Sequence, residues 1–210
     1  MKLAILGPGN VGSTLATAFA RKGHSIVLGV RDPVASKYRE LAKSIGAGTE
    51  VLGVREACAA AEAIVLATPW SATQAVIEQA AGALQGKILL DCTNPINAGF
   101  KLALGHTTSG GEMVAAWAKG AHVFKVFNIT GYNIMEEPLV DGRKALMLVA
   151  GDHDEHKVKV LQLAREIGFE ALDFGKLENA RLLEPMALAW IRLAYQHGVG
   201  RDFAFGILRR

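Results

Sequence analysis

Cysteine is scarce in this chain of 210 residues, because Cys58 and Cys92 are its only two. They lie far apart and neither belongs to a Cys-x-x-Cys pair, which is typical of a reduced, cytoplasmic setting. Long hydrophobic runs are missing as well. No apolar run reaches the length of a membrane span, and the four apolar residues after Lys2 are too few for the apolar region of a signal peptide. We therefore expect a cytoplasmic protein without membrane contact.

Charge of one sign is also in short supply, since 23 lysines and arginines face 20 aspartates and glutamates. No basic face with interleaved aromatic residues is visible, so we expect no nucleic-acid partner. The histidines are dispersed. His153 and His156 share a helix face, but at a helix start expected to be solvated, and we predict no metal site. No Ser/His/Asp or Cys/His arrangement can be built, and no lysine–asparagine or tyrosine–lysine pair has the spacing typical of hydroxyl oxidation. Catalytic residues therefore stay unassigned.

What the chain does contain is apolar sequence, because half of its residues are hydrophobic and only a fifth are charged. Short apolar runs alternate with segments of helical spacing through most of the chain. This order predicts an α/β fold with a doubly wound, mostly parallel Rossmann sheet. A broad apolar helical stripe follows the last expected strand. We predict a dinucleotide-binding domain over 1–175 and a C-terminal helical appendage over 176–210 that packs on this domain or on a dimer partner.

The strongest motif stands at the N-terminus, where Gly7-Pro8-Gly9-Asn10-Val11-Gly12 follows an apolar strand and opens a helix. Gly7 permits a tight turn, Gly9 lets the backbone approach a pyrophosphate, and Gly12 lets the helix pack closely on the strand. The pyrophosphate is expected at the helix N-terminus, where free N–H groups favour negative charge. The alternative is a glycine-rich turn that serves packing alone. We favour a dinucleotide site that also involves Asn10 and Val11.

The end of the second strand distinguishes the two nicotinamide cofactors. An acid there binds the ribose 2′-hydroxyl of NAD, whereas an arginine accommodates the 2′-phosphate of NADP. This chain offers Arg31 followed by Asp32. Asp32 precedes Pro33, and we interpret it as the N-cap of a helix that begins there. Arg31 is then left to face the phosphate, which favours NADP(H) over NAD(H); the alternative is a solvated surface charge.

Further residues lie at the carboxyl ends of later strands, where ligands of doubly wound sheets bind. Thr68 and Pro69 are expected beside the nicotinamide ribose. Trp70 offers a flat apolar wall, or else anchors a helix start in the core. Asn94 and Pro95 direct an amide at the nicotinamide, or form a plain turn. Asn128 hydrogen-bonds an acceptor ring, or caps a chain turn; these alternatives stay open from the sequence.

Together these motifs are similar to those of the NADPH-dependent, coenzyme F420-type reductases. The resemblance covers nearly the whole chain and is carried by six stretches: the glycine motif, Val30-Arg31, Thr68-Pro69-Trp70, Asn94-Pro95, Leu183-Glu184-Pro185-Met186 and Trp190-Ile191. The cytoplasmic oxidoreductase domain of the STEAP metalloreductases is similar too. The resemblance implies pyrophosphate binding at Gly9 to Val11, 2′-phosphate binding at Arg31, nicotinamide ribose binding at Thr68 and Pro69, and a homodimer. Archaeal deazaflavin enzymes of the family carry a histidine where Asn128 stands here.

The sequence thus predicts an NADP(H)-dependent oxidoreductase that exchanges hydride with a deazaflavin or flavin as small-molecule acceptor. Such a transfer depends on stacking and orientation of two rings and needs no strong general acid. Two alternatives stay open. One is a reductase of small imines of the pyrroline-carboxylate reductase type. The other is a non-catalytic NADPH sensor.

Overall fold

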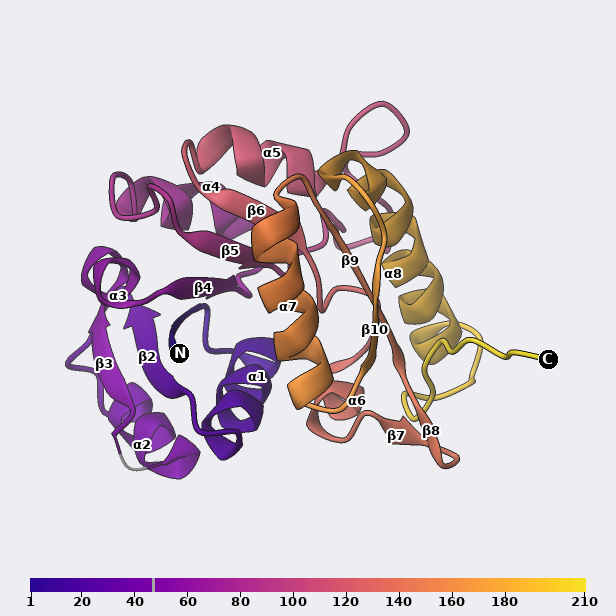
Figure 1. Ribbon diagram of the computed structural model, residues 1–210, viewed down its shortest axis with the longest axis horizontal. Coiled ribbons are helices and arrows are strands. Elements are labelled where there is room, and N and C mark those ends of the chain that lie inside the picture. Colours follow the sequence, from indigo (N-terminus) through magenta and orange to yellow (C-terminus); the bar gives the residue numbers. More distant parts are fainter. Residues whose placement is uncertain (47) are drawn as a thin grey trace.

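The computed structural model describes residues 1–46 and 48–210. Figure 1 shows a central twisted sheet with helices on both of its faces. The strands are β1 (Lys2–Leu6), β2 (Ser25–Val30), β3 (Glu50–Gly53), β4 (Ala63–Leu66), β5 (Ile88–Asp91), β6 (His122–Lys125), β7 (Leu139–Val140), β8 (Arg143–Lys144), β9 (Leu146–Gly151) and β10 (Glu170–Asp173). The helices are α1 (Asn10–Arg21), α2 (Ser36–Ile45), α3 (Val54–Ala60), α4 (Trp70–Gln79), α5 (Gly110–Trp117), α6 (Tyr132–Glu136), α7 (Asp154–Glu166), η1 (Leu177–Asn179) and α8 (Ala180–Tyr195).

Eight strands form the main sheet in the order β10-β9-β6-β5-β4-β1-β2-β3. β1 pairs in parallel with both β2 and β4, so the strand order reverses direction at β1. The carboxyl ends of β1, β4, β5 and β6 are level, because Leu6 pairs with Leu66, Leu66 with Asp91, and Asp91 with Lys125. The predicted doubly wound α/β fold is confirmed, and ligands are expected at this switch point.

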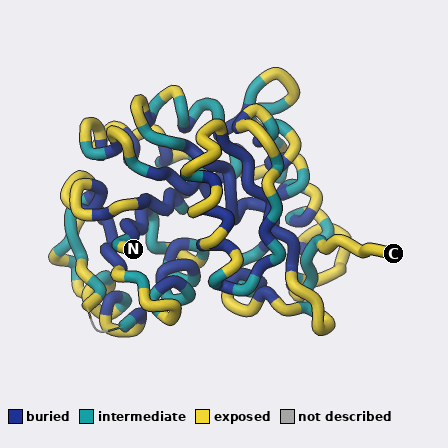
Figure 2. Tube along the Cα trace, in the orientation of Figure 1, coloured by how far each residue is buried: buried dark blue, intermediate teal, exposed yellow. Residues whose placement is uncertain are grey.

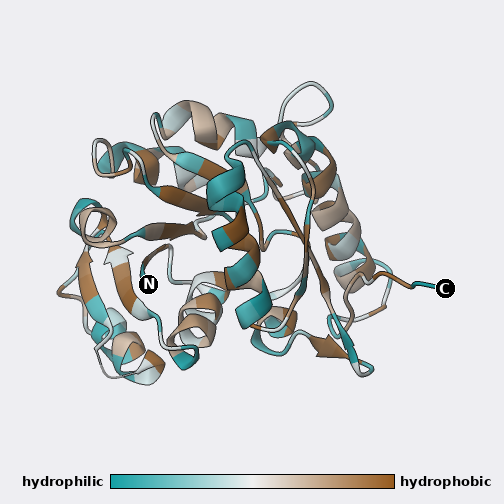
Figure 3. Cartoon of the chain, viewed as in Figure 1, coloured by the Kyte–Doolittle hydropathy of each residue, from teal (hydrophilic) through white to brown (hydrophobic). Residues whose placement is uncertain are grey.

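The core lies in two layers, one on each face of the sheet. Alternate residues of a strand point to opposite faces, so Leu3 and Ile5 pack under α1, α2, α6 and α7, while Ala4 and Leu6 pack under α3, α4 and α5. The strands β1, β4 and β9 are buried and apolar along nearly their whole length, and Figures 2 and 3 show this buried, apolar centre of the sheet. This burial on both faces explains why the strands read as continuous apolar runs in the sequence.

Two strands break the parallel pattern. β9 pairs antiparallel with β6, and β10 pairs in parallel with β9, so both run opposite to the other strands of the sheet. The chain reverses between β6 and β9 through α6 and the β7–β8 hairpin, which the sequence did not predict because each of its strands has only two residues. Helix α8 starts after β10 and runs along the β9–β10 side of the sheet (Figure 1).

The predicted role of Asp32 as a helix N-cap is wrong. Helix α2 begins at Ser36, with Ala35 in the N-cap position. Asp32 instead accepts a hydrogen bond from the backbone N–H of Val34 over 3.2 Å, inside the turn that precedes the helix. The dipeptide Asp32-Pro33 starts a turn here, because the carboxylate reaches the N–H two residues on and no further.

Candidate functional site

A cleft of about 810 Å³ lies over the carboxyl ends of β1, β4 and β5. The sequence predicted that ligand-binding residues gather at the carboxyl ends of these strands. Its lining comes from the glycine turn, the start of α2, the ends of β4 and β5, and one residue of α8: Gly7, Pro8, Gly9, Asn10, Val11, Lys37, Tyr38, Leu41, Ala67, Thr68, Pro69, Trp70, Cys92, Thr93, Asn94, Ile96 and Ile191.

The glycine turn presents backbone donors to this cleft. Gly7 has a left-handed φ of 84°, and a Cβ at this position would lie 2.8 Å from the carbonyl oxygen of Ala67. Gly9 is the N-cap of α1, and a Cβ there would meet no protein atom within 4 Å. Within the described residues no side chain caps α1 and no acid lies in its first turn. Its first N–H groups therefore face the cleft without a side-chain acceptor.

Gly12 serves packing rather than the cleft. It is buried, it does not line the cleft, and a Cβ would lie 2.3 Å from the carbonyl oxygen of Gly7 and 3.2 Å from Cγ2 of Ile5. Helix α1 can approach β1 this closely only because residue 12 has no side chain.

A second hollow of about 240 Å³ continues from the glycine turn toward the end of β2. Arg31 follows β2 directly, is exposed, and lines this hollow together with Tyr38 of α2. Lys37 lines the neighbouring cleft, and its Nζ lies 4.8 Å from the ring centre of Tyr38. Two cations thus stand at this end of the site. The sequence analysis missed Lys37 and Tyr38, although their place in the first turn of the helix after Arg31 was a usable signal.

Thr68, Pro69 and Trp70 form another part of the cleft wall, and Thr68 and Pro69 also line the hollow next to Arg31. The hydroxyl of Thr68 lies 2.9 Å from that of Thr73, which donates to the carbonyl of Pro69 over 3.1 Å. Trp70 is the first residue of α4, and its ring centre lies 5.4 Å from that of Trp117 in α5. Trp70 therefore lines the cleft and also packs against a neighbouring helix, while a contact between its ring and a cofactor stays a prediction.

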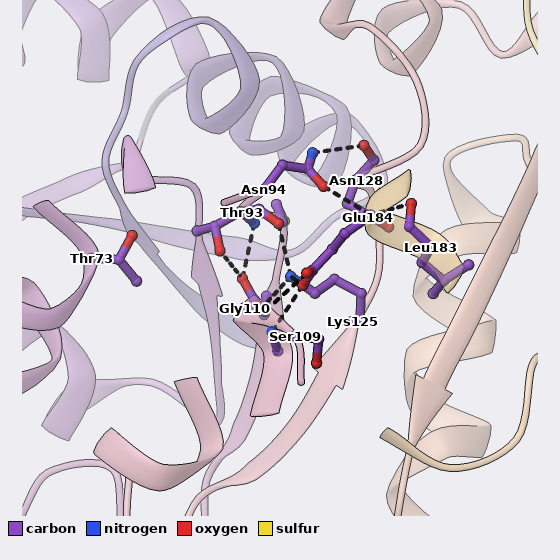
Figure 4. Close-up of polar contacts among 12 residues, drawn as sticks. Thr73, Thr93, Asn94, Ser109, Gly110, Lys125, Asn128, Leu183 and Glu184 are labelled. Carbon is purple, nitrogen blue, oxygen red and sulfur yellow. Dashed lines mark hydrogen bonds and ion pairs between the residues drawn. The ribbon is translucent and has the colours of Figure 1, made fainter. Parts of the chain in front are cut away.

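Asn94 and Asn128 form a reciprocal amide pair (Figure 4). Asn94 donates to the backbone carbonyl of Asn128 over 3.0 Å, and Asn128 donates back to Asn94 Oδ1 over 3.1 Å. Asn128 also donates to the carbonyl of Leu183 over 3.2 Å, and only 4% of its surface is exposed. Asn94 lines the cleft, whereas Asn128 and Pro95 do not. Asn128 thus fixes the amide of Asn94 from behind.

Below Thr93 and Asn94 lies a buried ion cluster that the sequence analysis did not anticipate. Lys125 Nζ contacts Asp91 Oδ2 at 2.7 Å and Glu184 Oε1 at 2.9 Å, and all three side chains are at most 1% exposed. Asp91 ends β5, Lys125 ends β6, and Glu184 comes from α8 (Figure 4). A lysine inside an apolar strand was a signal for this cluster, because a buried ammonium requires a partner.

Burial alone would lower the pKa of Lys125, but the charges of Asp91 and Glu184 outweigh this effect and hold its pKa above the ordinary value. Lys125 is therefore an ammonium ion, and it also donates to the carbonyl of Thr93 over 2.8 Å. Burial and the charge of Asp91 raise the pKa of the Cys92 thiol. Cys92 is therefore a neutral part of the cleft wall.

Comparisons with known proteins match this chain to one family. Residues 2–95 match the family model described as NADP oxidoreductase, coenzyme F420-dependent. The F420-dependent NADP reductase of Methanocaldococcus jannaschii is 31% identical over 200 residues, which cover 89% of this chain and 89% of the relative. The chain belongs to the F420-dependent NADP reductase family.

Two further proteins are similar to this chain. A solved structure of a candidate F420-dependent NADP-reductase from Arthrobacter sp. FB24 superposes with a TM-score of 0.91 at 30% identity and covers both chains completely. Metalloreductase STEAP3 of Rattus norvegicus is 33% identical over 192 residues. These cover 89% of this chain but 36% of STEAP3, so the chain spans about a third of that relative. No helix among the described residues has both the length and the apolar character to cross a membrane.

The cleft of this F420-dependent NADP reductase family member fits a phosphorylated dinucleotide. The open space in front of Gly9 adjoins the uncapped start of α1, where a pyrophosphate accepts backbone N–H groups. Arg31 and Lys37 bring positive charge to the lining of the two hollows, and Thr68, Trp70 and Asn94 contribute uncharged groups. This combination suits a ligand that carries phosphates at one part and an uncharged ring at another.

Proposed function

We propose that this protein is an oxidoreductase that transfers hydride between NADPH and coenzyme F420, an 8-hydroxy-5-deazaflavin. In the forward direction NADPH gives up a hydride with its electron pair and becomes NADP⁺, while the deazaflavin takes up the hydride and one proton from water. The observation that carries this proposal is the uncapped helix start with its open glycine, flanked by Arg31 on one side and an apolar cleft end on the other.

The cofactor half of the proposal assigns a task to each end of the cleft. The first N–H groups of α1 hold the pyrophosphate. Arg31 receives the 2′-phosphate with its planar guanidinium, and Lys37 adds a point charge. Thr68 and Pro69 border the nicotinamide ribose. Asn94, with its amide fixed by Asn128, offers a donor and an acceptor of settled orientation to the carboxamide of the nicotinamide.

The acceptor half depends on the walls at the nicotinamide end. Ile96, from the loop after β5, and Ile191, from α8, both line the cleft, and Trp70 adds an aromatic surface. A flat ring placed between such walls stacks on the nicotinamide and excludes water from the transfer path. The protein's contribution to the transfer is this orientation, because a hydride needs no proton donor at the moment it moves. A contact between Asn128 and the acceptor stays a prediction, and in the structure Asn128 reaches the cleft through Asn94.

A two-part titration tests the proposal. Purified protein is first titrated with NADPH and with NADH, and NADPH is expected to bind more tightly. NADPH and oxidised F420 are then mixed with the protein, and the absorbance of the deazaflavin is expected to fall as it is reduced. Tighter binding of NADH would contradict the cofactor half. Tight NADPH binding without reduction of F420 or a flavin would favour the NADPH sensor instead.

We also propose that the protein is a homodimer in the cytoplasm. Support for the dimer comes from apolar side chains that are exposed on α8 and just after it. Leu182, Tyr195 and Val199 are 60%, 55% and 54% exposed. Large apolar side chains that are exposed on one element and just after it are suited to burial against a second copy. The division into residues 1–175 and 176–210 goes with this proposal, because the second segment carries these side chains. The cysteine usage supports the cytoplasmic setting.

A further inference from the structure

The buried cluster of Asp91, Lys125 and Glu184 has an unbalanced charge. Every contact of Glu184 comes from a donor: Gly110 N and Gly111 N, each at 2.9 Å, and Lys125 Nζ. Asp91 likewise accepts from the N–H of Thr93 at 2.9 Å, from its hydroxyl at 2.7 Å and from Lys125. A carboxyl group surrounded only by donors is ionised. Two carboxylates and one ammonium leave the cluster with a net charge of −1.

This charge lies directly under the nicotinamide end of the cleft. Thr93 lines the cleft, while its N–H, hydroxyl and carbonyl are all bonded to Asp91 or Lys125. The three side chains are at most 1% exposed, so bulk water screens their charges less than it screens a surface pair. Figure 4 shows Lys125 and Glu184 beneath Thr93 and Asn94.

Glu184 and Lys125 can pack closely against the start of α5 because two glycines stand there. A Cβ on Gly110 would lie 3.0 Å from Glu184 Oε1 and 3.2 Å from Trp70 Cζ3. A Cβ on Gly111 would lie 3.1 Å from Lys125 Cε. The N-terminus of α5 thereby offsets part of the cluster's negative charge without contributing a full unit.

We propose that this cluster tunes the bound cofactor toward its oxidised form. The inference rests on the proposed function, because it requires the nicotinamide to lie above Thr93. The nicotinamide ring is neutral in NADPH and carries a positive charge in NADP⁺. A buried negative charge beneath it favours NADP⁺, and bound NADPH becomes a stronger hydride donor. Asp91, Lys125 and Glu184 act on the ring through the field and through Thr93, as positioning and tuning residues.

The test measures the dissociation constants of NADP⁺ and NADPH for the same protein and takes their ratio. Asp91→Asn and Glu184→Gln each remove one negative charge from different elements. In both variants the binding of NADP⁺ is expected to weaken relative to the binding of NADPH by roughly fivefold to twentyfold. This is the effect of one unit charge across a layer of side chains at an effective dielectric near 20. Thermal unfolding and circular dichroism identify which variants are folded.

Two controls separate charge from structure. Glu184→Asp keeps the charge, so the ratio is expected to stay at the wild-type value even if both affinities fall. Glu112→Gln breaks the exposed contact between α5 and Arg181 of α8 and leaves the buried charge intact, so it too should leave the ratio unchanged. An unchanged ratio in either folded neutralising variant, or a changed ratio in Glu184→Asp, would overturn the proposal. If wild-type protein binds neither cofactor, the proposed function itself has failed.

Discussion

Gly9 and Gly12 both lack a side chain, but for opposite reasons. A Cβ on Gly9 would project into open space at the mouth of the cleft, whereas a Cβ on Gly12 would press into the backbone of Gly7. The first glycine therefore leaves room for a ligand, and the second leaves room for the protein's own chain. The sequence motif predicted these two tasks, and the surroundings of the two residues agree with that prediction.

Gly9→Ala and Gly12→Ala should consequently separate binding from folding. We expect Gly9→Ala to lower the free energy of unfolding by less than about 1 kcal/mol, the range for a changed N-cap residue. It should weaken NADPH binding at least tenfold, because the methyl group occupies the pyrophosphate's place. Gly12→Ala should destabilise by about 1–3 kcal/mol through overpacking. Urea unfolding and cofactor titration measure both quantities. A Gly9→Ala variant that binds like wild type would place the pyrophosphate elsewhere.

Arg31 is the residue on which the choice of cofactor depends. We expect Arg31→Ala to weaken NADPH binding by about 1–3 kcal/mol, the range for a lost charge-assisted hydrogen bond. NADH has no 2′-phosphate and should bind nearly as before. Arg55→Ala is a suitable control, since Arg55 is an exposed arginine of α3 that does not line either hollow. Equal losses for NADPH and NADH would contradict the assignment of Arg31.

At the scale of whole elements, α8 is joined to α5 by two carboxylates of different character. Glu184 of α8 is buried and accepts from two N–H groups of α5 and from Lys125 of β6, while Glu112 of α5 pairs with Arg181 of α8 at a partly exposed position. Glu184→Ala leaves these two N–H groups and one proton of Lys125 buried without an acceptor, so it should destabilise the fold by several kcal/mol, about 1–3 kcal/mol for each unpaired group. Arg181→Ala should cost much less, because water screens the exposed pair. Urea unfolding of both variants checks this order; the reverse order would refute it.

The surface contact between these helices should also be sensitive to acid. The hydrogen bond from Arg181 holds the pKa of Glu112 below its ordinary value of 4.5. A carboxyl group whose pKa is lower in the folded state stabilises the fold above its unfolded pKa, and this contribution is lost as the pH falls through the folded value. Unfolding measured from pH 6 to pH 3 should therefore depend less steeply on pH in Arg181→Gln than in wild type. Identical slopes would show that the pair contributes nothing.

Elements with long apolar patterns were predictable, and contacts between distant segments were not. β1, β4, β5 and β9 stand out as apolar runs because the sheet buries both of their faces. The cleft residues of the glycine turn, Thr68 to Trp70, and Asn94 followed from their places at strand ends, whereas Lys37 and Tyr38 of α2 did not. The ion cluster did not, because Asp91, Lys125 and Glu184 are far apart in the chain and meet only when α8 docks. The turn at Asp32 was misjudged because a capping residue and a turn residue look alike in sequence.

For the molecule as a whole, the proposed homodimer makes a direct prediction. Leu182 on α8 is 60% exposed and belongs to the apolar surface described above. A charge at this position should oppose burial against a second copy, so Leu182→Glu is expected to shift the protein toward the monomer. Analytical ultracentrifugation over a range of concentrations measures the shift. Val158→Glu is the matched control, since Val158 is 66% exposed on α7. A wild-type protein that sediments as a monomer would end the dimer proposal.

Helix α8 reaches both the buried cluster and the cleft, with Glu184 in one and Ile191 in the other. They are seven positions apart, close to two full turns, so both side chains leave the helix in nearly the same direction. Inserting or deleting a single residue between them would rotate one relative to the other by about 100°. Lys125 would then lose a carboxylate, or the acceptor would lose a wall. The spacing along this helix is therefore under tighter constraint than its exposed residues, such as Pro185 and Ala189.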